Sequence, residues 1–204
     1  MLIKQEILRK LFHIGLSLIP LLYINLGKTS FLCLFTPLAI AIIGIDYCRC
    51  KYNSVGSAIT PLFKIIMREK ELSRKHLSGV SWAFFCAVIN FTIFHPAVAV
   101  TGFLILTFAD AMAAVVGKSV KSAKFYQKSC AGSLAFFITS ILVIISCGIY
   151  FDCRLPFFLF ASFVAMFVTY LEAYPDLFRI DDNLLIPMSF GICMTLLDLM
   201  WHIL

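Results

Sequence analysis

Long apolar runs separated by short polar segments dominate the hydropathy pattern of the chain. A membrane-spanning helix needs roughly 20 mostly apolar residues to cross a hydrocarbon core of about 30 Å. Seven runs come near that length, each bounded by Gly, Pro, Asn or charged residues: Leu11–Leu26, Phe31–Tyr47, Val80–Phe94, Ala97–Val116, Ser133–Tyr150, Leu155–Leu171 and Leu184–Leu204. The pattern predicts an all-α, polytopic helix bundle of about seven transmembrane helices, forming one integral membrane domain over residues 1–204.

The composition agrees with a membrane environment. Hydrophobic residues make up 61% of the 204 residues and the mean hydropathy is +0.96, which is far outside the range of water-soluble domains. The net charge of +6 does not indicate nucleic-acid binding, because Lys and Arg lie in short segments between apolar runs. The eight Cys form no CxxC pair, so neither a zinc site nor a disulfide framework is indicated.

The basic residues predict an orientation. With seven spans and a cytoplasmic N-terminus, all of the 17 basic residues except Lys28 and Arg154 fall on the cytoplasmic side, as the positive-inside rule requires. The C-terminus is then on the opposite side. The first run also resembles a secretory signal peptide, but no small-residue cleavage site follows it near Leu26, so a retained span is expected.

The segment Ser57–Glu71, between the second and third runs, has apolar residues at helical spacing and charges elsewhere around the wheel. This pattern predicts an amphipathic helix in the membrane interface. Its simplest role is a surface anchor, and the functional alternative is a lid beside the entrance for a lipid substrate.

Asp110 is an ionisable residue within the fourth apolar run, and such residues are costly in the membrane and often functional. It lies about two turns before Gly117. Ala109, Ala113 and Gly117 recur every four residues and form a smooth stripe that lets another helix approach closely. Asp110 is therefore a candidate metal ligand or proton acceptor; the alternative is a hydrogen bond between helices.

A lysine-rich segment follows, ending in Lys128-Ser129-Cys130-Ala131-Gly132-Ser133 directly before the fifth run. Small residues at the start of a helix leave backbone N–H groups free, and the helix dipole favours an anion there. The segment is a candidate polyphosphate site, although no P-loop sequence is present. The positive-inside bias alone also produces lysine-rich loops.

Three further polar clusters lie at the ends of apolar runs. In the first, Glu6, Arg9, Lys10 and His13 share one helical face. The second precedes Ser78-Gly79, and the third precedes the seventh run, where adjacent carboxylates favour a divalent metal or, alternatively, a solvated helix cap. The second comprises Glu71, Arg74, Lys75 and His76, and the third Asp181, Asp182 and Asn183.

All of these clusters fall on the cytoplasmic side in the predicted topology. A water-soluble polyanion with Mg²⁺ can reach such a site from the cytosol, while an apolar substrate arrives from the bilayer. This convergence is the main indication of an active site that comes from the residues themselves.

In order along the chain, the polar segments resemble those of the CTP-dependent polyprenol and lipid kinases: phytol kinase, dolichol kinase and CTP-dependent diacylglycerol kinase. The N-terminal cluster is similar to the family's E-x-x-R-K-x-x-H, and Leu77-Ser78-Gly79 to its hydrophobic-polar-Gly start of a span. Three longer motifs complete the resemblance: Ala109-Asp110 through Gly117-Lys118 (G-D-x-x-A-x-x-x-G-[KR]), Lys128 through Ser133 (K-S-x-[EA]-G-[ST]) and Asp182-Asn183-Leu184-x-Ile186-Pro187 (D-N-L-x-I-P).

The sequence departs from the family at three places. Ala109 replaces the Gly before the acid, and a second Gly usual after G-[KR] is missing around Ser119 to Lys121. Ala131 stands where dolichol kinases usually have Glu, which brings the sequence closer to phytol kinases.

The resemblance implies transfer of the γ-phosphoryl group of CTP, with Mg²⁺, to the hydroxyl of an isoprenoid alcohol (phytol or polyprenol) or of diacylglycerol. It implies Asp110 and Asp182 as metal ligands or catalytic carboxylates, with His13 beside them. The residues implied to bind CTP are Arg9, Lys10, Lys118, Lys128, Ser129, Gly132, Ser133 and Asn183.

Two alternatives remain. Phosphatidate cytidylyltransferase also uses CTP, Mg²⁺ and a lipid, but its C-terminal H-G-G-x-x-D-R motif is absent from the sequence. A small transporter would place charges near the membrane midplane. Here the acids near the membrane cluster at one face, with Asp198 in the last span as the exception.

Overall fold

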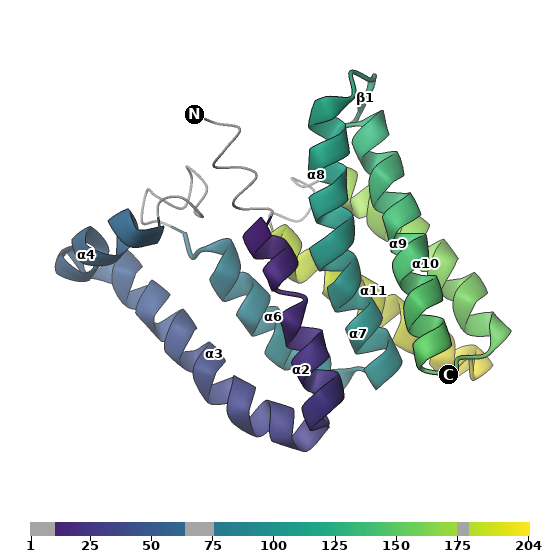
Figure 1. The fold of residues 1–204 in the computed structure, drawn as a ribbon, viewed down its shortest axis with the longest axis horizontal. Helices are drawn as coiled ribbons and strands as arrows, with labels where there is room; N and C mark the ends of the chain where they lie inside the picture. The colour runs from purple at the N-terminus through teal and green to yellow at the C-terminus, as the bar shows by residue number, and fades with distance from the viewer. Residues whose placement is uncertain (1–10, 64–75, 175–179) are drawn as a thin grey trace. The chain divides into compact units, whose positions relative to one another are not determined.

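The structure is a computed structural model that describes residues 11–63, 76–174 and 180–204, without the side chains of residues 61–63. Figure 1 shows that it is built from helices, apart from one short hairpin. This confirms the predicted all-α polytopic class. The chain forms two compact units, Met1–Ile89 and Asn90–Leu204, whose boundary falls inside the helix α6 (Gly79–Ile93). One integral domain for the whole chain stays a prediction.

Within the described ranges, five helices are long and apolar enough to cross a membrane. The apolar helices Leu11–Leu26 and Gly79–Ile93, at the first and third predicted spans, are shorter. Every predicted run is thus helical, but two fall below the roughly 20 residues of an ordinary span. The five long helices are α3 (Lys28–Lys51), the continuous helix Pro96–Ser119, α9 (Cys130–Tyr150), α10 (Leu155–Ala173) and α11 (Asp182–Trp201).

Aromatic contacts connect the helices of the first unit. Gly27 joins α2 (Leu18–Leu26) to α3 with a φ of 74°, a conformation that glycine adopts without strain. Across this turn the Tyr23 ring packs edge-on against Phe31 at 5.4 Å. Phe35 stacks on Phe31 at 4.8 Å and on Phe84 of α6 at 5.0 Å. These rings set the pairing of α2, α3 and α6.

The expected amphipathic helix begins earlier than predicted. Helix α4 spans Asn53–Phe63 and follows α3 after a break at Tyr52, whose backbone is extended. It covers the first part of the segment Ser57–Glu71, and the rest lies outside the described residues. Its location in the membrane interface stays a prediction.

A buried polar network joins α3 to the start of α6. Asp46 accepts hydrogen bonds from the Nε of Arg49 at 2.6 Å, the backbone N–H of Ser78 at 2.7 Å and the Ser81 hydroxyl at 2.6 Å. Arg49, only 1% exposed, also donates to the carbonyl of His76 at 3.0 Å. Both Asp46 oxygens are therefore bonded, and one of them satisfies an N–H at the beginning of α6.

Asp46→Ala is expected to destabilise the fold by about 3–5 kcal/mol, because it leaves the Arg49 charge buried without its carboxylate partner. Unfolding of the purified protein by SDS titration in mixed micelles measures the loss. Ser57→Ala, which removes an exposed hydroxyl bonded within its own helix, is the control and should change stability little. Equal effects of the two substitutions would contradict a structural role for this network.

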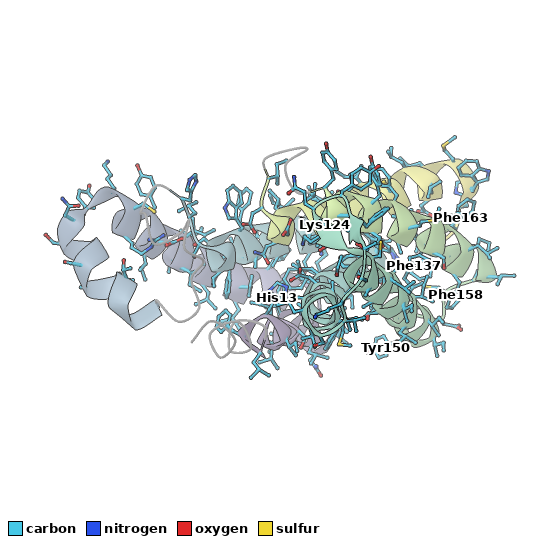
Figure 2. The ribbon with its side chains drawn as sticks, turned by 90° about the horizontal axis from the view of Figure 1, so that it is seen from above. His13, Lys124, Phe137, Tyr150, Phe158 and Phe163 are labelled. Carbon is cyan, nitrogen blue, oxygen red and sulfur yellow. The ribbon has the colours of Figure 1, made fainter. Side chains whose placement is uncertain are left out.

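In the second unit, three segments form the continuous helix Pro96–Ser119: α7 (Pro96–Leu104), the π-helical segment η1 (Ile105–Ala109) and α8 (Asp110–Ser119). Helix α8 packs against α9, α9 against α10, and α10 against α11, which returns to α7 (Figure 1). Their outward faces are apolar, as lipid contact requires, and include the exposed Tyr150 labelled in Figure 2. The core contains fully buried aromatic rings: Phe103, Phe136, Phe157 and Phe190.

Candidate functional site

A short hairpin closes one end of the second unit, between α8 and α9 (Figure 1). Its strands are β1 (Lys124–Phe125) and β2 (Lys128–Ser129), paired antiparallel. The Gln127 N–H donates to the carbonyl of Ala173 at 3.3 Å, and the Tyr126 ring packs edge-on against Tyr170 and Tyr174. The hairpin, which carries the Lys124 labelled in Figure 2, is thus held against the C-terminal end of α10.

The predicted small-residue stripe forms a close contact between α8 and α9. A Cβ atom added to Gly132 would lie 2.9 Å from the Ala113 carbonyl oxygen and 3.2 Å from the Cα of Gly117. The Ser129 hydroxyl bridges the two helices, because it donates to the Gly117 carbonyl at 3.3 Å and accepts from the Gly132 N–H at 3.1 Å. The predicted close approach of another helix to the small-residue stripe is thus confirmed, and that helix is α9.

The free backbone amides expected at the start of α9 are not free. The Cys130 N–H donates to the Ala123 carbonyl at 2.9 Å, the Ala131 N–H to the Ser122 hydroxyl at 3.0 Å, and the Gly132 N–H to Ser129. The preceding loop folds back and uses the groups that the sequence pattern assigned to phosphate. Ser129 and Gly132 thus have structural roles, and a phosphate contact of either residue stays a prediction.

Lys128 forms an ion pair that the sequence analysis did not anticipate. Its Nζ lies 2.5 Å from the Oε1 of Glu172, which is in the last turn of α10. The Glu172 side chain is 1% exposed and that of Lys128 is 34% exposed. The two partners are 44 positions apart along the chain, so no local sequence pattern indicates this pairing.

The pKa of Lys128 is influenced by Asp110 and Asp182 as well as by Glu172. Burial alone lowers the pKa of Lys128, but the carboxylates of Glu172, Asp182 and Asp110 together raise it above its usual value. Lys128 is therefore protonated at neutral pH and up to the raised pKa. Two of the predicted catalytic residues, Asp110 and Asp182, therefore lie near enough to Lys128 for their charges to influence its pKa.

The π-helical segment sets the direction of Asp110. Asp110 is 7% exposed and is the first residue of α8, immediately after η1. A π-helical turn contains extra backbone and rotates the residues that follow it relative to those before it; such turns occur often at functional sites. The predicted two helical turns from Asp110 to Gly117 are α-helical, and the π-helical turn before them is a feature that the sequence pattern did not indicate.

At the start of α11, the alternative prediction of a helix cap is confirmed for Asp181. Asp181 is the N-cap, and its Oδ1 accepts from the backbone N–H of Asn183 at 3.1 Å and from the Asn183 side-chain amide at 2.6 Å. Asn183 is 4% exposed and is used in this cap. Asp182, which is part-exposed, remains the carboxylate of this cluster that acts on Lys128.

Two buried oxygen atoms in this region have no hydrogen-bond partner among the described residues: Glu172 Oε2 and Ser133 Oγ. Ser133 is 6% exposed and lies one helical turn after Ser129. Buried polar atoms without partners are rare in folded proteins and cost free energy. At a candidate site, they mark positions where a ligand can bond.

The remaining predicted site residues are Lys118, His13, Arg9 and Lys10. Lys118 is exposed in the last turn of α8. His13 is in the first unit, and Arg9 and Lys10 lie outside the described residues, as do Glu6, Glu71, Arg74 and Lys75. The participation of Arg9, Lys10 and His13 therefore stays a prediction.

The carboxylates near Lys128 fit a Mg²⁺ site that substrate phosphates and water would complete. Within the described ranges, no three His, Cys, Asp or Glu side chains are grouped so that they could hold a metal by themselves. Mg²⁺ in phosphoryl-transfer enzymes is commonly held by one or two carboxylates together with substrate phosphates and water. Asp110 and Asp182, both close enough to act on Lys128, fit that kind of site.

Comparison with known proteins gives distant relatives over most of the chain. The chain is 28% identical to an uncharacterised protein of Rickettsia prowazekii, covering 92% of both chains. It is 25% identical to CTP-dependent diacylglycerol kinase 1 of Eremothecium gossypii, over 94% of this chain and 67% of the relative. The corresponding kinase of Saccharomyces cerevisiae is 26% identical over 90% of this chain and 70% of its own.

No protein-family model and no solved structure matches the chain. The two kinases nonetheless align with nearly all of it, and so with parts of both units. At the coarse level of the family, this similarity supports placing the chain with the CTP-dependent lipid kinases.

Proposed function

We propose that this integral membrane protein transfers the γ-phosphoryl group of CTP to the hydroxyl of a membrane lipid alcohol. The hydroxyl oxygen attacks the γ-phosphorus, and the bond from that phosphorus to the β,γ-bridging oxygen breaks. The bridging oxygen keeps the electron pair, the hydroxyl proton passes to a carboxylate of the site, and the products are a lipid phosphate and CDP. Such reactions depend mainly on positioning and on neutralising phosphate charge.

The observation that carries the proposal is the convergence on Lys128 of three carboxylates from separate helices. Asp110 begins α8, Glu172 ends α10 and Asp182 begins α11, and all three act on the Lys128 charge. Purely structural packing between apolar helices has no need for such a group, because each charge adds a cost in the membrane. A phosphoryl-transfer site needs both a cation for phosphate and carboxylates.

Each residue has a distinct role in the proposed reaction. Lys128 and the exposed Lys118 bind CTP phosphates, and the buried Ser133 hydroxyl donates to a phosphate oxygen. Asp110 and Asp182 hold Mg²⁺, which when bound supplies positive charge to the phosphate oxygens. Arg9, Lys10 and His13 are proposed to complete the nucleotide site from the N-terminal segment.

Two classes of acceptor fit a hydroxyl on an apolar tail: an isoprenoid alcohol such as phytol or a polyprenol, and diacylglycerol. The kinases named above are diacylglycerol kinases, which favours diacylglycerol as the first substrate to test. The motif resemblance to phytol kinases keeps the isoprenoid alcohols in the same panel. The proposed site is cytoplasmic, with the N-terminus on the same side and the C-terminus opposite.

The purified protein in lipid nanodiscs should transfer label from γ-³²P-CTP to dioleoylglycerol or to an isoprenoid alcohol in the panel. Transfer should be much weaker from ATP, GTP or UTP, and should stop when EDTA removes Mg²⁺. Label reaching the lipid from α-³²P-CTP would instead identify a cytidylyltransferase. Absence of transfer from both labels to every lipid would refute the proposed function.

A further inference from the structure

We infer that Glu172 is a further catalytic residue, whose Oε2 accepts a hydrogen bond from the hydroxyl of the lipid alcohol. The inference rests on the proposed function and names the group that orients its acceptor substrate. Neither the sequence motifs nor the relatives' names point to this residue.

The two Glu172 oxygens have different surroundings. Oε1 is paired with Lys128 at 2.5 Å, whereas Oε2 is buried and has no hydrogen-bond partner among the described residues. A buried carboxylate oxygen without a donor is unfavourable, because it has lost water and gained nothing in return. The arrangement becomes favourable when a ligand supplies the missing donor.

Asp46 shows how this chain satisfies a carboxylate that has a structural role. Three donors bond to Asp46, and they occupy both of its oxygens. Glu172 differs in having one oxygen bonded and the other open to a donor. It also lies at the C-terminal end of α10, where the helix dipole disfavours a negative charge. A counter-ion for Lys128 alone could be placed at lower cost elsewhere.

The chemistry of the site selects a hydroxyl as the missing donor. A phosphate oxygen would be repelled by the carboxylate, and Glu172 belongs to no metal-binding group among the described residues. A lipid hydroxyl is a neutral donor that reaches the end of a membrane helix from the bilayer. Since Lys128 is bound to the other oxygen of the same carboxylate, a hydroxyl at Oε2 would lie beside a group proposed to hold the CTP phosphates.

The test compares Glu172→Gln with wild type, using dioleoylglycerol and an analogue in which hydrogen replaces the hydroxyl. In Gln, the carbonyl can still accept from Lys128, but the NH₂ group then replaces the acceptor that is proposed to bond the lipid hydroxyl. We expect kcat/KM for dioleoylglycerol to fall about 10- to 100-fold, the loss of one hydrogen bond to a charged group. Affinity for Mg²⁺–CTP, measured without lipid, should change less than about threefold.

The deoxy analogue separates hydroxyl recognition from general damage. As a competitive inhibitor, it should bind wild type more weakly than dioleoylglycerol does, and this difference should vanish in Glu172→Gln, as in a double-mutant cycle. Glu172→Asp keeps an acceptor oxygen and should retain more activity than Glu172→Gln. If the Gln variant does not fold, the same comparison of the two lipids is made with Glu172→Asp. Thr169→Val is the matched control, because it alters a buried side chain of α10 whose hydroxyl donates to the Ala165 carbonyl in the same helix.

Each failure has its own signature. Unchanged kinetics in Glu172→Gln, or a loss of CTP affinity equal to the loss of turnover, would overturn the assignment of Glu172. Neither result would contradict the proposed kinase function. A wild-type protein that transfers no label from CTP would overturn the proposed function itself. An unchanged preference for the hydroxyl over the deoxy lipid in both Glu172 variants would show that another group recognises the hydroxyl.

Discussion

Replacing Asp110 by Asn is expected to lower CTP-dependent lipid phosphorylation by about 100- to 1,000-fold, the usual cost of losing one group that helps to stabilise charge in the transition state. The substitution keeps the size of the side chain and removes its charge. Because an uncharged amide is cheaper to bury in the membrane than a carboxylate, the variant should insert and purify normally. Initial rates of label transfer, measured beside detergent thermostability, check both parts of the expectation.

Asp198→Asn is the matched control for this experiment. Asp198 is also an acid of the second unit, but it lies near the opposite end of α11 from Asp182 and accepts the N–H of Leu204 at 3.0 Å. Its replacement should leave turnover within a few-fold of wild type. If Asp110→Asn also keeps near-wild-type turnover, Asp110 serves only as a hydrogen-bonding residue between helices, a contact worth about 0.6 kcal/mol on average in membranes.

Lys128→Met is expected to reduce both stability and activity. It leaves the buried Glu172 carboxyl without its partner, and breaking a fully buried pair in this way costs about 3–5 kcal/mol. The loss should fall toward the lower end, because the Lys128 side chain is 34% exposed and solvent screens part of the interaction. The rate of lipid phosphorylation should also fall, and by more than partial unfolding explains, because the proposed CTP site loses the cation that pairs with its carboxylates.

The double variant Lys128→Met with Glu172→Gln separates these two effects. Removing both charges eliminates the unpaired buried carboxylate, so most of the lost stability should return, while activity should stay as low as in Lys128→Met. Equilibrium unfolding and CTP binding on the wild type, both single variants and the double variant complete the cycle. Recovery of activity together with stability would mean that the pair is only structural.

Local patterns were sufficient to predict the helices and part of the site. Apolar runs near the length of a span located every apolar helix, since burial of backbone hydrogen bonds in lipid leaves few alternatives to a helix. The four-residue repeat ending at Gly117 predicted a close helix contact, which Gly132 completes. Asp110 was indicated by the cost of an ionisable residue within an apolar run, Lys128 by its place before a small-residue helix start, and Asp182 by its adjacent carboxylate.

The same local reasoning was wrong about the start of α9. Small residues at a helix start do leave amides exposed in isolation, but Ala123 and the Ser122 hydroxyl fold back onto them. The path of the loop before α9 is determined by the hairpin. The position of the hairpin is determined in turn by its contacts with Tyr170, Ala173 and Tyr174. None of these contacts is encoded within one turn of the helix.

By itself the sequence determined the class of the protein, the positions of its apolar helices and the small-residue stripe, because each follows from residues within a few positions of one another. Only the tertiary structure decided which charges meet. Lys128 pairs with Glu172, which is 44 positions away along the chain. The π-helical segment before Asp110 changes the rotation of Asp110 about the helix axis. Electrostatic partners in an apolar bundle are chosen by helix packing and rotation, and neither quantity can be read from a local pattern.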